Sequence, residues 1–298
     1  MIDFHELKTT SKLPSPKGVM LNVIRLCQRE QVALPELARQ IQADPVLAGR
    51  IIKIANVLNP VKSRQIASVT NDVLLLVGVH SVRQLALGIS LVTSYQSGAC
   101  TGFSYGQFWS RSLAMACAAQ ALAERVRIAP VAEMFTCGLL AGIGRLGLAM
   151  VRPDAYSGLL AGQAAGTPAE LDQAEVQLFG ISHVGLAALM MADWSIPRLF
   201  SDAVRFHETP QRSGFADGSR QQRLVQLLHA AARIADLCIA DDAQREVDLV
   251  PLLDSAAQLG MDRAALAAAI NQTSREWSDS GAMLQVKTRP LPLLDEVD

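Results

Sequence analysis

The sequence predicts an all-α protein, a bundle of many helices in two lobes. Two observations lead to this fold class. Apolar residues recur at spacings of three and four through most of the chain, as on the buried face of a helix. No alternation of apolar and polar residues reaches the length of a convincing strand. Half of the 298 residues are hydrophobic but only 5% are aromatic, so we expect a core of aliphatic side chains.

The first third of the chain contains the start and stop signals of several short helices. Asp44 followed by Pro45 predicts an N-cap with proline at the first helical position. Gly78 predicts the end of the helix before it. We expect helices within 16–30, 34–41, 45–58, 73–77 and 82–92.

The rest of the chain is also helical by pattern. Ser104 with Gln107, and Thr167 with Glu170, fit capping boxes at helix starts. We expect helices or apolar helical segments at 105–127, 131–150, 154–164, from 168 onward, and at 183–194, 197–206, 220–240, 251–259 and 262–278. Residues 97–104 and 211–220 read as loops. The tail 285–298, with two prolines at alternate positions, is expected to be extended.

Composition excludes several classes of function. Lysine and arginine number 27 against 28 aspartates and glutamates, so no overall field draws the chain to nucleic acid or to an anionic membrane. The five cysteines are scattered, which predicts free thiols in the reducing cytoplasm. The apolar stretches 73–79 and 138–151 are too short, or carry an arginine, for a membrane span. The mean hydropathy of +0.22 still indicates apolar surface that a partner covers.

The common catalytic motifs do not occur in the sequence. It contains no GxxxxGK[ST] loop, no GxGxxG after a strand, no HExxH and no GxSxG. Its histidines are His5, His80, His183, His207 and His229, and none lies three or four residues from another. A helical pair of metal-binding histidines is therefore not present. We predict no cofactor.

Several segments in a fixed order resemble the HDOD domain, a bacterial relative of the HD metal-dependent phosphohydrolases. The opening contains LPSP, IQADPVLAGRIIKIAN and SVTNDVLLLVGVHSVRQLALGISL. The middle contains FWSRSLAMA and MFTCGLLAGIGRLGL, and the last part contains AEVQLFGISHVGLAALMMADWSIPRLFSDAVRFHETP. Each motif alone is weak, but their joint order and spacing are specific. The resemblance covers about residues 12–210 and implies an HD-like helical fold.

The same resemblance implies that the metal ligands are missing. HD enzymes hold metal with a histidine, an adjacent His-Asp pair and a later aspartate. The first histidine position corresponds to Arg111, and the pair corresponds to Ala141 and Gly142. Asp236 matches the later aspartate, and Arg145 stands where a catalytic lysine sometimes follows the pair. One carboxylate does not make a metal site, so the sequence predicts a non-enzymatic protein that binds no metal there.

Six residues are candidates for a remnant pocket: Arg111, Arg145, Glu175, His183, His207 and Asp236. The histidines could line the pocket or simply be hydrogen-bonded within helix junctions, and Glu175 could pair with one of them. Arg111, Arg145 and Arg152 could form an anion pocket, or be solvated or paired with carboxylates. Without its ligands, the centre of the pocket is expected to be small and apolar.

Three functions follow as alternatives. The first is a non-catalytic module of bacterial signal transduction that binds partner proteins, such as response regulators or proteins of cyclic-di-GMP turnover, and a homodimer is left open. The second is a receptor for a phosphorylated small ligand, a nucleotide or cyclic dinucleotide, at the remnant pocket. The third is a cryptic hydrolase that uses His183, His207 and Asp236 as metal ligands.

The resemblance also suggests a division of the chain. Residues 1–100 would form the N-terminal lobe, 101–242 the HD-like lobe, and 243–298 a C-terminal helical extension with a tail. The last segment carries no motif of a receiver or GGDEF domain. We expect it to complete the helical lobe rather than to add a catalytic domain.

Overall fold

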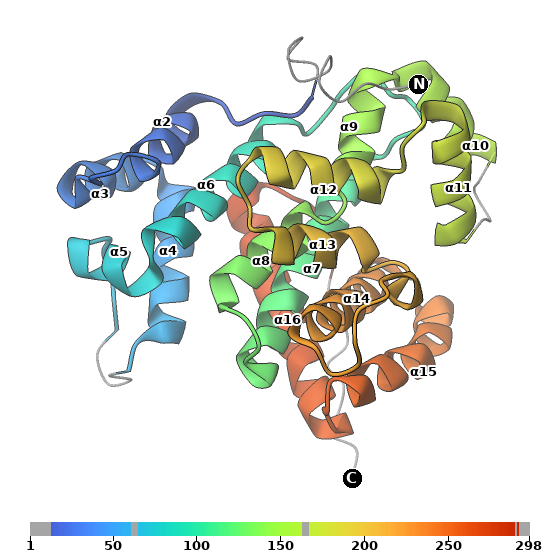
Figure 1. Ribbon diagram of the computed structural model, residues 1–298. Helices are drawn as coiled ribbons and strands as arrows, with labels where there is room; N and C mark the ends of the chain where they lie inside the picture. Colours follow the sequence, from blue (N-terminus) through green and yellow to red (C-terminus); the bar gives the residue numbers. More distant parts are fainter. Residues whose placement is uncertain (1–12, 61–64, 163–166, 290, 292–298) are drawn as a thin grey trace. The chain divides into compact units, whose positions relative to one another are not determined.

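The computed structural model describes residues 13–60, 65–162, 167–289 and 291, and these ranges contain helices but no strand (Figure 1). The predicted all-α class is therefore confirmed. The chain forms two compact units. One comprises residues 15–95, and the other comprises residues 96–298 together with the segment before Ser15. The division into segments ending at residues 100 and 242 stays a prediction.

The unit of residues 15–95 is a small helical bundle. Its helices are α2 (Gly18–Cys27), α3 (Leu34–Gln42), α4 (Pro45–Leu58), α5 (Asn71–Val77) and α6 (Val79–Ser94). Helix α2 packs along α6, and α4 contacts both α5 and α6. The two ends of the unit are tied together, because the Tyr95 hydroxyl accepts a hydrogen bond from the Ser15 N–H (3.0 Å) and donates one to the Ser15 carbonyl (3.1 Å).

The unit of residues 96–298 is built around one long helix, α7 (Tyr105–Val126). The helices that follow are α8 (Val131–Leu140), α9 (Ile143–Val151), α10 (Pro153–Gly162), α11 (Pro168–Phe179), α12 (His183–Asp193), α13 (Arg198–Phe206), the 3-10 turn η1 (Pro210–Arg212), α14 (Arg220–Ile239), α15 (Asp242–Gln258) and α16 (Arg263–Leu284). Helices α8, α14 and α16 all pack on α7. The middle of α7 is therefore buried, and its many alanines let three neighbours approach it.

Most of the local start and stop signals act as the sequence predicts, but Gln107 does not make the reciprocal bond of the capping box predicted with Ser104. Asp44, Ser104 and Thr167 each precede a helix and accept a hydrogen bond from the backbone N–H three residues further on. At Thr167 the reciprocal bond from the third helical residue completes the capping box. Gly78 ends α5 with a φ of 87°, a conformation that glycine adopts without steric cost.

Three boundaries differ from the sequence-based expectations. The apolar stretch 131–150 is divided into α8 and α9 by Ala141 and Gly142. Helix α15 begins at Asp242 rather than near residue 251, and α16 extends to Leu284 rather than ending near 278. The two prolines of the tail lie outside the described residues.

One described stretch, Val131–Val151, is long and apolar enough to cross a membrane, contrary to the expectation that no stretch would be. The bent pairs α5–α6 and α11–α12 would also qualify if each pair were taken as one span. Within the structure, 83% of the Val131–Val151 window is buried by the rest of the protein. Packing of α8 and α9 inside the unit therefore accounts for the apolar character of this stretch.

Candidate functional site

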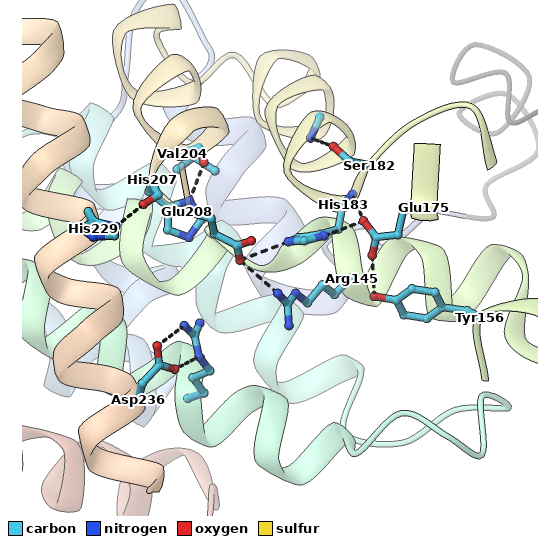
Figure 2. Close-up of polar contacts among 12 residues, drawn as sticks. Arg145, Tyr156, Glu175, Ser182, His183, Val204, His207, Glu208, His229 and Asp236 are labelled. Atoms are coloured by element: carbon cyan, nitrogen blue, oxygen red, sulfur yellow. Dashed lines mark hydrogen bonds and ion pairs between the residues drawn. The ribbon is translucent and has the colours of Figure 1, made fainter. Parts of the chain in front are cut away.

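A cavity of about 460 Å³ lies in the larger unit, and most of the candidate residues meet there. Its polar lining consists of Arg111, Arg145, Thr167, His207, Glu208, His229, Arg233 and Asp236. Four of the six candidates thus line the cavity directly. The other two, Glu175 and His183, lie behind its wall and connect to it through Glu208 (Figure 2).

The start of one helix and the end of another position the histidines and Glu208 around the cavity. Helix α12 begins immediately after Ser182, whose hydroxyl accepts a hydrogen bond from the Gly185 N–H, so His183 is the first helical residue. Helix α13 ends at Phe206, so His207 and Glu208 follow it directly. Their side chains can therefore turn toward the cavity instead of continuing the helix.

Arg111 on α7 forms a two-point ion pair with Asp236 on α14. The distances are 2.6 Å from Nε to Oδ1 and 3.2 Å from Nη2 to Oδ2. Both side chains are partly buried, at 26% and 43% exposure. The only carboxylate that the family resemblance assigned to a metal therefore already has a cationic partner supplied by the chain.

The residues present do not fit a metal site. Ala141 and Gly142 have no side-chain donor atom, and the Arg111 guanidinium would repel a cation beside Asp236. In the described ranges no group of three or more His, Cys, Asp or Glu side chains is arranged to hold a metal ion. His183, His207 and Asp236, considered as ligands of a cryptic hydrolase, are not brought together as such a group.

Glu208 connects the cavity to the buried histidine. Its Oε1 accepts a hydrogen bond from Arg145 Nη2 at 3.1 Å and lies 3.2 Å from His183 Nε2 (Figure 2). The Glu208 side chain is only 12% exposed. Burial disfavours its charge, but the imidazolium of His183 and the guanidinium of Arg145 outweigh that effect and hold the pKa of Glu208 well below its usual range.

His183 is fully buried between two carboxylates. Its Nδ1 lies 2.6 Å from Glu175 Oε2, and the same oxygen accepts a hydrogen bond from the His183 backbone N–H at 2.6 Å. The Tyr156 hydroxyl donates to the other oxygen of Glu175 at 3.1 Å. Burial disfavours the imidazolium, yet Glu208 and Glu175 together raise the pKa of His183 to about 9. His183 is therefore charged at neutral pH.

His207 has the opposite character, although it is also buried. Its Nδ1 lies 2.6 Å from the carbonyl oxygen of Val204, which can only accept, so Nδ1 carries the proton. Burial lowers the pKa of His207 to about 4 despite the nearby Glu208. His207 is thus neutral, and its Nε2 is an acceptor. The neighbouring His229 donates from Nδ1 to the His207 carbonyl at 2.7 Å.

These contacts settle several expectations. Glu175 does pair with one of the histidines, His183, and both histidines are hydrogen-bonded within helix junctions. Arg152 follows the end of α9, is exposed and does not line the cavity. The expectation of a small, apolar pocket centre is wrong, because charged side chains from α7, α9 and α14 and the end of α13 fill the lining.

Three lining residues, Glu208, His229 and Arg233, are not among the candidates that the sequence predicts. Glu208 follows His207 directly in the segment HETP, which was the available signal. His229 and Arg233 are four residues apart on α14, on the same helical face as Asp236. Helical spacing from Asp236 is therefore the signal that identifies His229 and Arg233.

An all-helical fold with this cavity, and with the motifs that surround it, defines an HD-like helical protein. The model of the HDOD domain family matches residues 13–210, about two thirds of the chain. The chain belongs to the HDOD domain family.

Solved structures agree with this assignment. The MmoQ response regulator from Methylococcus capsulatus str. Bath is 34% identical, with a TM-score of 0.54 over 86% of this chain and 97% of that one. An HDOD domain protein of unknown function from Geobacter sulfurreducens is 20% identical, with a TM-score of 0.62 over 93% and 96%. A protein from Shewanella amazonensis SB2B, provisionally assigned as a phosphohydrolase, is 22% identical, with a TM-score of 0.65 over 93% and 97%. No curated protein matches the chain significantly.

Proposed function

We propose that the protein is a non-enzymatic regulatory module of bacterial signal transduction that acts in the cytoplasm by binding partner proteins. The observation that carries the proposal is the ion pair between Arg111 and Asp236. The Arg111 guanidinium is already bound to the Asp236 carboxylate, which a catalytic metal would need as a ligand. A cavity with this ion pair lacks the free carboxylate that metal-assisted hydrolysis would require.

The second ion pair supports the same proposal. The Glu208 carboxylate is held by both His183 and Arg145. Freeing either Glu208 or Asp236 for a metal would leave an arginine or histidine cation without its partner. For Glu208, which is 12% exposed, such a loss costs about 3–5 kcal/mol. Asp236 is 43% exposed, so solvent screening makes the corresponding loss smaller.

A regulatory role has support from the family and from one relative. The HDOD match spans most of the chain, and the relative at 34% identity is a response regulator. Because a module without catalytic ligands can act only through what it binds, we propose protein partners. The expected classes are response regulators and proteins of cyclic-di-GMP turnover.

The enzymatic part of the proposal is tested on chain purified without chelator. We expect less than about a tenth of a metal ion per chain by elemental analysis, because a site of three ligands should bind tightly. We also expect no hydrolysis of a generic phosphomonoester or of cyclic-di-GMP with added Mn²⁺. Stoichiometric metal, or a hydrolase activity that a chelator removes, would overturn this part.

The binding part is tested by crosslinking in the native bacterium followed by mass spectrometry. Two exposed leucines, Leu75 on α5 (64% exposed) and Leu178 on α11 (49%), lie in different units and provide matched variants. We expect the wild type to retain a signalling protein. One of the two variants, Leu75→Asp or Leu178→Asp, should lose this partner, and the other variant should still retain it. Recovery of no signalling protein, or equal recovery with both variants, contradicts the proposal.

A further inference from the structure

We propose that the cavity of the larger unit binds a phosphate monoester whose organic part is about the size of one nucleoside, with Arg233 as the phosphate-binding side chain. The ligand class follows from three features of the lining: an arginine that no carboxylate pairs with, a hydrogen-bond acceptor and an apolar wall. This inference is independent of the protein partners proposed above.

The first feature is the distribution of charge. Three arginines and two carboxylates line the cavity. Both carboxylates are already paired, Asp236 with Arg111 and Glu208 with Arg145. Arg233 makes no hydrogen bond or ion pair with any described residue, so its guanidinium is available. An available guanidinium offers a planar pair of N–H donors that matches two oxygens of a phosphate.

The surroundings of Arg233 favour an anion over a second protein carboxylate. Behind the wall, the charge of His183 is matched by the Glu175 carboxylate, so this pair leaves the positive excess of the lining unchanged. The remaining N–H groups of Arg111 and Arg145, beyond those bonded to carboxylates, are further donors beside the cavity. A bound phosphate would therefore add negative charge to a lining that carries one excess cation.

The second feature is His207, which is 1% exposed and lines the cavity. Because Nδ1 donates to Val204, Nε2 is left as an acceptor, and it has no hydrogen-bond partner among the described residues. A ligand hydroxyl or amine in the cavity would donate to this acceptor. The ligand therefore carries a donor in addition to its anionic group, as a ribose or a base does.

The third feature is the apolar wall and the size of the space. Leu160, Pro168, Leu171 and Ala232 complete the lining. These side chains favour contact with a flat, weakly polar body rather than with bulk water. A volume of about 460 Å³ is in the lower part of the range of about 300–1,000 Å³ for ligand sites. This size suits one nucleotide unit better than a cyclic dinucleotide.

Isothermal titration calorimetry of the full chain tests the proposal with five probes: AMP, GMP, adenosine, inorganic phosphate and cyclic-di-GMP. We expect AMP or GMP to bind at least about tenfold more tightly than either adenosine or inorganic phosphate, because each of these lacks half of the contacts. The proposal is overturned if neither nucleotide binds, if adenosine binds as well as AMP, or if cyclic-di-GMP binds more tightly than both mononucleotides.

Two matched variants assign the phosphate contact. Arg233→Ala should weaken binding of the nucleotide by about tenfold to 100-fold, the cost of removing a charged hydrogen-bonding group. Arg223→Ala removes the same charge from the same helix, outside the cavity lining, and should leave binding unchanged. Circular dichroism and a melting curve verify that both variants fold. Equal affinity of Arg233→Ala and wild type would exclude Arg233 as the phosphate-binding side chain and so contradict the proposal.

The outcome of the nucleotide titrations can be distinguished from the outcome of the partner-crosslinking experiment. Failure of all nucleotide probes would leave crosslinked partners unaffected, because Leu75 and Leu178 do not line the cavity. Conversely, nucleotide binding without any captured signalling protein would support a ligand receptor and contradict the protein-binding proposal.

Discussion

His183 and His207 are both buried, yet their surroundings give them opposite charge states. His183 lies between the carboxylates of Glu175 and Glu208, and its pKa rises to about 9. His207 donates to the neutral carbonyl of Val204, and burial lowers its pKa to about 4. The number of carboxylates that each ring contacts therefore decides whether burial or charge pairing dominates.

The pH dependence of stability should reveal the pairing of His183 with Glu208. An unfolded histidine titrates at about pH 6.5. Because the folded pKa of His183 is raised to about 9, its stabilising contribution is complete below pH 6.5 and is lost as the pH rises through 9. Glu208→Gln removes one of the carboxylates responsible. We expect it to lower the free energy of unfolding by about 1–3 kcal/mol at pH 6.5, and by less at pH 9.5.

Urea denaturation at the two pH values measures this difference. The control is Asp202→Asn on α13, which breaks the Arg198–Asp202 pair at 3.3 Å. Because Arg198 is 91% exposed, the control should change stability by less than about 1 kcal/mol at either pH. If the loss caused by Glu208→Gln does not depend on pH, the pair with His183 does not explain it, and the contact with Arg145 or packing does.

At the scale of single residues, the sequence predicted several residues of the site, but fewer of the contacts between their side chains. The pairing of Glu175 with a histidine was foreseen, because the family motif places Glu175 eight residues before His183. The link from Glu208 to His183 was not foreseen, because it joins residues 25 positions apart in two different helical segments. No local pattern encodes a contact that depends on how α12 and α13 pack.

The contact between α9 and α12 shows how an element positions the site. A Cβ atom at Gly144 would overlap the carbonyl oxygen of His183 and lie 2.8 Å from the Ala187 nitrogen. The absence of a side chain at Gly144 therefore lets the first turn of α12 lie against α9. This close approach sets Arg145, the next residue on α9, beside the carboxylate that also contacts His183.

Two glycine substitutions separate this packing effect from helix propensity. Gly144→Ala should destabilise the protein by about 3 kcal/mol or more, because rigid backbone atoms must shift. Gly158→Ala, in the exposed part of α10, meets nothing within 4 Å and should stabilise the protein by about 0.5–1 kcal/mol. Thermal and urea melts of both variants measure the two effects. A tolerated Gly144→Ala would show that α12 is not held against α9 in this way.

At the scale of elements, sequence signals located helix starts well and helix interiors less well. The caps at Asp44 and Thr167 are local chemistry, and both act as predicted. The sequence predicts a helix over 251–259, but Pro251 lies inside α15, which begins at Asp242. Proline is usually excluded from a helix interior, so tertiary packing has overridden the local preference here.

At the scale of the whole molecule, the C-terminal helix α16 is part of the larger core. Trp277 on α16 is 1% exposed, and its Nε1–H donates to the Ser110 carbonyl on α7 at 2.9 Å. The buried Gln120 on α7 donates to Glu276 at 3.1 Å. These contacts fix the position of α16 along α7. Sequence patterns predicted that the segment is helical, but not which helix it covers.

The contribution of α16 to stability can be measured at Trp277. Trp277→Ala should lower the free energy of unfolding by about 3–5 kcal/mol, because a large buried ring and a hydrogen bond are lost. Met283→Ala on the same helix, where the side chain is 40% exposed, should change stability by less than about 0.5 kcal/mol. A similar small effect for both variants in urea denaturation would contradict the assignment of α16 to the core.

The charge pairs of the cavity also predict how the whole molecule responds to metal ions. A divalent ion bound with a Kd of about 1 μM would stabilise the fold by about 4 kcal/mol at 1 mM, which shifts the melting temperature by several degrees. We expect no shift with 1 mM Mn²⁺ or Zn²⁺ and none after chelation, because Arg111 and Arg145 already neutralise the cavity carboxylates.

Arg111→Ala provides the sharper version of this experiment. The substitution releases Asp236 from its ion pair, but it supplies no second or third ligand, because Ala141 and Gly142 have no donor atoms. The variant should therefore be less stable than wild type and still show no metal-dependent rise in melting temperature. A rise only in the variant would mean that Arg111 alone blocks an intact metal site. A rise in wild type would show that the cavity holds metal in spite of both arginines.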